Sequence, residues 1–180
     1  MSTAPALADL RARFLDYKRL AERALERLGE EDFFRSLDWE SNSPALLVKH
    51  LAGNLRSRYT DFLTSDGDKP DRRRDLEFQR EPDDTRESLM AAWAEGWRRL
   101  ELALDALAPG DLDRRVTIRG EPYSVENALR RSLAHTAYHV GQLVLLAKHY
   151  SAGSWLSLSI PRGASEPYSK EIRDKFRDPC

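Results

Sequence analysis

Residues 133–142 read LAHTAYHVGQ, a proline-free run that places His135 and His139 four positions apart. On an α-helix, side chains at positions i and i+4 lie on one face, with Cβ atoms about 5–6 Å apart. The two imidazoles can therefore converge on one metal ion. The wider run 124–150 predicts a long helix in which an apolar packing face lies beside a second stripe that carries both histidines and Gln142.

The other two histidines differ in whether they can reach the same ion. His149 lies so far beyond His139 that the separation along the helix axis is roughly 15 Å, whereas metal–nitrogen bonds are about 2 Å long. His50 lies in a separate amphipathic run, PALLVKHLAGNL at residues 44–55, which can pack beside the first. Three neutral imidazoles from two helices would leave coordination positions for water or substrate, as in catalytic rather than structural zinc-type sites.

Length and composition fit one domain over residues 1–180, with a core at about 5–150 and a tail at 151–180. The 29 basic and 30 acidic residues give a net charge of -1, which provides no electrostatic case for nucleic acid or an anionic membrane as a partner. No apolar run approaches the roughly 18–20 residues of a membrane-spanning helix, and the start of the chain lacks a secretory signal. We therefore expect a cytoplasmic protein, with the single cysteine, Cys180, at an inert end.

Apolar residues that recur at spacings of three and four predict an all-α fold. The four predicted helices cover residues 5–28, 44–63, 84–108 and 124–150. Ser43 followed by Pro44 is a strong helix start, and Asp84 with Glu87 resembles a capping box. Between the helices we expect a connector at 30–42, a long loop at 64–83 and a two-stranded ribbon at 115–123, followed by an irregular tail.

Two polar features on and after the second helix have alternative interpretations. Asn54 lies one turn after His50 on the same face, and it either orients that imidazole by a hydrogen bond or lies at the helix surface. The triplet Arg72-Arg73-Arg74 could attract a phosphate, but Asp71, Asp75 and Glu77 bracket it. We therefore expect a solvated charge run rather than an anion site.

Four helices, a loop after the second, a ribbon before the fourth and the three histidines together resemble the DinB-like superfamily of small bacterial four-helix-bundle proteins. The resemblance covers about residues 5–150 and is greatest to an uncharacterised branch. It implies metal ligands at His50, His135 and His139, a divalent ion such as zinc or nickel, and a homodimer. Some relatives use such a site for thiol-dependent transfer or isomerisation.

Two functional hypotheses follow. In the first, the protein is a metal-dependent thiol transferase or hydrolase that acts on a small molecule, for which the metal would lower the pKa of a thiol or of water. No carboxylate lies near the histidine pair on its helix, which favours thiol transfer slightly. In the second, a non-catalytic dimeric bundle binds a metal or a small ligand as a sensor or scaffold, and Gln142 could close the metal's coordination shell.

Overall fold

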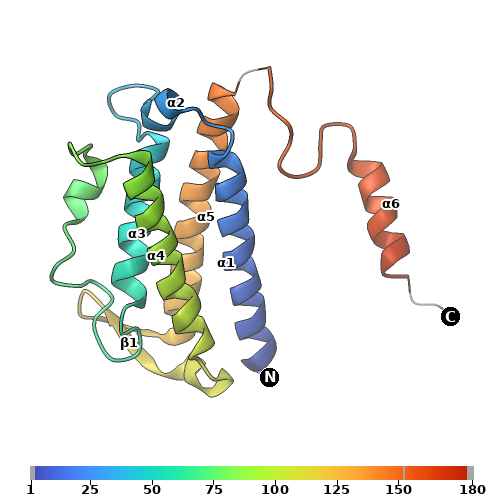
Figure 1. Cartoon of the computed structure of the whole chain (residues 1–180). Helices are drawn as coiled ribbons and strands as arrows, with labels where there is room; N and C mark the ends of the chain where they lie inside the picture. The colour runs from blue at the N-terminus through green and yellow to red at the C-terminus, as the bar shows by residue number, and fades with distance from the viewer. Residues whose placement is uncertain (1–2, 152, 178–180) are drawn as a thin grey trace.

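The computed structural model describes residues 3–151 and 153–177, and four long helices dominate it (Figure 1). They are α1 (Thr3–Leu25), α3 (Pro44–Tyr59), α4 (Arg86–Asp105) and α5 (Val125–Tyr150). The shorter elements are α2 (Glu30–Phe34), the 3₁₀ turns η1 (Arg74–Phe78) and η2 (Pro109–Asp113), strands β1 (Arg115–Ile118) and β2 (Glu121–Ser124), and α6 (Ser165–Lys175). The predicted all-α class, with one small antiparallel ribbon, is confirmed.

The apolar stripes of the long helices meet in one core. Phe14 of α1, Leu51 of α3 and the pair Trp93 and Trp97 of α4 are fully buried in it. Each such side chain contributes about 1.5–3 kcal/mol when it leaves water. Helix α3 packs mainly on α4, while α1 packs mainly on α5. A Cβ at Gly96 would lie 2.9 Å from the carbonyl oxygen of Ala52, so glycine is needed where α3 and α4 approach each other.

The helix starts follow the predicted caps in two of three cases. The Ser43 and Ser124 hydroxyls accept hydrogen bonds from backbone N–H groups in the first turns of α3 and α5. The capping box of α4, however, is formed by Thr85 and Ser88, one position beyond the predicted one. Asp84 instead accepts a hydrogen bond from Lys49 Nζ at 2.8 Å, which ties the chain to α3 just before α4 begins.

The segment between α3 and α4 is more ordered than a long loop. Helix α3 ends at Tyr59, short of the predicted residue 63, and the chain then returns along α3 through η1, which packs against that helix (Figure 1). Asp66 holds this segment to the ribbon by accepting hydrogen bonds from the N–H groups of Arg119 and Gly120, both at 2.8 Å. Those two residues form the β1–β2 turn with positive φ angles, as a type I′ hairpin requires.

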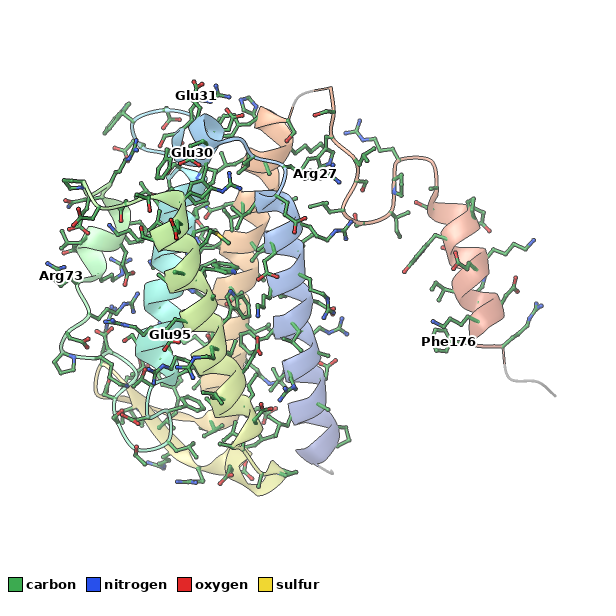
Figure 2. The ribbon with its side chains drawn as sticks, viewed as in Figure 1. Arg27, Glu30, Glu31, Arg73, Glu95 and Phe176 are labelled. Carbon is green, nitrogen blue, oxygen red and sulfur yellow. The ribbon has the colours of Figure 1, made fainter. Side chains whose placement is uncertain are left out.

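The predicted irregular tail contains a helix. Helix α6 extends away from the four long helices, and none of its described residues is buried (Figure 1). Phe176, just after it, is 74% exposed (Figure 2). Residues 153–164 are irregular as predicted, whereas charged and apolar residues at helical spacing form α6 without packing on the core. Among the described helices, none has both the length and the hydropathy to cross a membrane.

Candidate metal centre

The three predicted histidines lie together between α3 and α5. His50 and His135 approach with their Nε2 atoms 3.0 Å apart, and one ligand atom from each of the three residues lies within 4.8 Å of the others. The ring centroids are 4.6–5.0 Å apart. Nitrogens that are each about 2 Å from one ion lie at most about 4 Å apart, so the His50–His135 pair already suits a shared metal and a small side-chain movement would bring in the third ring.

The orientation of His50 is set by a carboxylate from the segment between α3 and α4. His50 Nδ1–H donates to Glu77 Oε2 at 2.8 Å. In this tautomer Nε2 carries a lone pair that can bind a metal. Arg72 in turn donates hydrogen bonds to both oxygens of Glu77, from Nε to Oε1 and from Nη2 to Oε2, each at 2.8 Å. A carboxylate behind a histidine fixes its tautomer and raises its basicity as a ligand.

Glu77 reaches His50 because α3 has a glycine where the carboxylate lies. A Cβ at Gly53 would overlap Glu77 Oε1 and lie 2.9 Å from its carboxyl carbon. Burial raises the pKa of Glu77, but the hydrogen bonds from Arg72 and His50 outweigh this and lower the pKa overall. Glu77 therefore remains a carboxylate, with both oxygens engaged.

The histidines of α5 are held differently. His139 Nδ1–H donates to Gln142 Oε1 at 2.8 Å, one turn further along the helix. Gln142 thus contacts the imidazole at Nδ1 rather than at Nε2. His135 Nδ1 is buried and has no hydrogen-bond partner among the described residues. Burial, followed by the neighbouring His139 and His50, lowers the pKa of His135 to about 3, so the ring is neutral at physiological pH, as a metal ligand must be.

Two expectations about polar residues can be compared with the structure, and the one for the arginine triplet needs correction. The partner of His50 Nδ1 is Glu77, whereas Asn54 lines the cavity beside the histidines. The arginine triplet is not one solvated run, because the Arg72 side chain is only 4% exposed. Arg73 does project outward (Figure 2). Glu77 was not identified as a site residue from the sequence, because it is 27 positions from His50 and only the fold of the intervening segment joins them.

The sequence of the chain matches the family described as "Protein of unknown function (DUF1572)" over residues 2–164. The chain belongs to this family. No curated protein and no solved structure matches it at a significant level. Helix α6 begins at Ser165, directly after the part of this DUF1572 protein that the family match covers.

The donor set of this DUF1572 protein fits a divalent metal ion. In the described part of the chain, the cluster consists of three imidazoles with no carboxylate or thiol among the possible ligands. Two of the rings have their Nδ1–H groups satisfied, so their Nε2 lone pairs are available. Imidazole suits zinc, nickel, copper and iron, and three protein ligands leave room for a further one.

A cavity of about 280 Å³ opens beside the cluster. His50 and His135 form one part of its wall, and Asn54 and Ser132 continue it along α3 and α5. The rest of the wall is built by arginines from α3, α5, the ribbon turn and the segment around η1: Arg58, Arg72, Arg74, Arg119 and Arg131. His50 and His135 are therefore accessible from a polar space large enough for a small molecule.

Proposed function

We propose that this protein is a DinB-like, metal-dependent enzyme in which His50, His135 and His139 bind one divalent ion, zinc or nickel. The observation that carries the proposal is the cluster itself: three imidazoles lie together, two of them hydrogen-bonded at Nδ1, and His50 and His135 line a cavity. The four long helices and the ribbon before α5 support the further proposal that the fold is a four-helix bundle of DinB type. Because the resemblance to DinB-like proteins also implies a homodimer, we propose that this protein forms one.

Thiol-dependent transfer fits the cavity better than hydrolysis does. A bound divalent ion would supply Lewis acidity and lower the pKa of a thiol. Hydrolysis usually requires a free carboxylate or similar base near the water, but Glu77 has both oxygens bonded to Arg72 and His50. The described lining of the cavity contains no carboxylate. Thiol transfer needs less from the protein, since the thiol proton can pass to solvent.

The reaction class we propose forms a bond between the thiol sulfur and an electrophilic carbon, while the leaving group departs with its electron pair. The protein's part is to hold the acceptor in the cavity and to keep its imidazoles oriented. Gln142, which was considered as a fourth ligand in a non-catalytic site, is engaged with His139. That contact favours an open coordination shell and therefore the enzyme over the sensor or scaffold.

The test is a conjugation assay with the zinc- and nickel-loaded protein, using cysteine or glutathione with 1-chloro-2,4-dinitrobenzene and a panel of smaller electrophiles. A Cys180→Ser variant serves as the background, because it removes the chain's only thiol. We expect turnover that requires metal and disappears in His139→Ala. Equal rates for the loaded and chelated protein, or hydrolysis that does not depend on thiol, would contradict the assignment.

A further inference from the structure

The cavity beside the histidines carries positive charge that the rest of the described chain does not neutralise. Arg72 pairs with Glu77, and Arg119 pairs with Asp68 at 2.9 Å. By contrast, Arg58 and Arg131 have no carboxylate within ion-pair distance among residues 3–151 and 153–177. Two uncompensated cations therefore share one wall of a small cavity.

Arg58 is the more unusual of the two. It is 7% exposed, and its Nη1 is buried without a hydrogen-bond partner in the described structure. Burial, followed by the positive charges of Arg131 and Arg72, lowers its pKa to about 10, which still leaves the guanidinium charged at neutral pH. A buried charge without a partner is costly, and a ligand that supplies the opposite charge would offset this cost.

The surroundings of Arg58 are built to hold it in place. A Cβ at Gly67 would lie 3.1 Å from Arg58 Nη1, so the guanidinium packs against a glycine. Gly67 is itself fixed, since its N–H donates to Thr117 O at 2.8 Å and its carbonyl oxygen accepts from Ser57 Oγ at 2.9 Å. The side chain of Arg58 therefore lies in a buried space between α3 and the ribbon rather than at the solvent-exposed surface.

Helical spacing connects the arginines to the histidines. On α3, His50 and Arg58 are separated by two turns, with Asn54 between them, and on α5, His135 follows Arg131 by one turn. Residues four apart share a helix face. Because α3 and α5 run in opposite directions (Figure 1), both rows proceed from the histidines toward the ribbon. The cavity thus has a histidine end and, toward the ribbon, an end with Arg58 and Arg131. Arg72 lines it close to His50 and is paired with Glu77.

We propose that this cavity binds a small molecule bearing a carboxylate or phosphate group, with Arg58 and Arg131 as the residues that bind the anion while the reacting part lies toward the histidines. Arginine's planar fork matches the oxygens of both groups. The proposal rests on the proposed function for the identity of the reacting end, but the arginine site itself is formed without metal.

The test is calorimetric titration with inorganic phosphate and with succinate at constant ionic strength, on the full-length protein both metal-loaded and chelated. Chloride at the same ionic strength is the reference. We expect saturable binding in both preparations. Arg131→Gln, at an exposed position that should not disturb folding, and Arg58→Met should each weaken it at least 10-fold.

Arg130→Gln is the matched control, because Arg130 neighbours Arg131 on α5 but pairs with Glu126 and does not line the cavity. Its affinity should equal that of the wild type. Tighter binding of phosphate than succinate, or the reverse, would identify the preferred group, and either order supports the site. Absence of saturable binding, or equal losses in Arg130→Gln and Arg131→Gln, would overturn it. Metal content measured on the same samples tests separately whether the three histidines bind a metal ion.

Discussion

Glu77 Oε2 lies 2.8 Å from His50 Nδ1, and Arg72 holds the same carboxylate from the other side. This relay joins a residue of the segment before α4 to the candidate metal centre on α3. It also explains why that segment is ordered against α3, since the side chains of His50, Glu77 and Arg72 are all buried. The orientation of His50 therefore depends on the segment as well as on the helix.

The relay predicts that Glu77→Gln weakens zinc binding about 10- to 100-fold, the usual effect of losing a partner behind a ligand histidine. The amide can still accept from His50, but it cannot pair with Arg72 as a charge. Competition titration against a chromogenic chelator gives the affinity, and circular dichroism checks the helical content. Glu95→Gln is the control, because Glu95 pairs with Arg98 and Arg99, two solvent-accessible arginines of α4. Equal zinc affinity in both variants would refute the relay.

The glycine that accommodates Glu77 offers an independent test. Gly53→Ala should lower zinc affinity to a similar degree, because the new Cβ would overlap Glu77 Oε1. Gly141→Ala on α5 adds the same methyl group in open space, and it should leave zinc affinity unchanged while raising stability by up to about 1 kcal/mol through helix propensity. If Gly53→Ala bound zinc as tightly as Gly141→Ala, the close approach would have no bearing on the site.

Gln142 should act by orienting His139 rather than as a ligand. We expect Gln142→Leu to reduce zinc affinity about 10-fold with one ion still bound per chain, whereas Gln142→Glu should retain or increase the affinity by accepting more strongly from His139 Nδ1–H. X-ray absorption spectroscopy of the zinc-loaded protein would count histidine ligands in each. If Gln142→Leu lowered the number of nitrogen and oxygen atoms bound to zinc, the Gln142 amide would be a metal ligand.

Asp66 predicts a pH-dependent contribution to stability. Burial raises its pKa, but hydrogen bonds from the N–H groups of Gly120, Asp68 and Arg119 lower the pKa overall. A carboxyl with a depressed folded-state pKa stabilises the fold above its unfolded value of about 4, and this stabilisation is lost as the pH falls toward the folded-state value.

Urea unfolding should therefore show that Asp66→Asn costs about 1–2 kcal/mol at pH 7 and less at pH 3. The control is Asp71→Asn, whose carboxylate is 71% exposed and pairs with Arg56 at the surface. This variant should change the free energy of unfolding by less than about 0.5 kcal/mol. A cost for Asp66→Asn that stayed constant from pH 7 to pH 3 would contradict the role of its charge.

The sequence was sufficient to predict features that repeat with helical period. The spacing of His135 and His139 and the exclusion of His149 follow from helix geometry alone, and the structure brings His50 to the pair. Glu77, Arg72 and Arg58 could not be placed this way. Their positions depend on the return of the chain along α3 and on two close approaches at glycines, which leave no periodic pattern in the sequence.

Metal stoichiometry of the tag-free protein, measured by elemental mass spectrometry, tests the central claim most directly. It should be compared with His50→Ala, His135→Ala and His139→Ala, and with His149→Ala as the control outside the cluster. We predict about one divalent ion per chain in the wild type and in His149→Ala, and far less in the other three. No bound ion after incubation with zinc and nickel, or equal content in all variants, would contradict a three-histidine metal site.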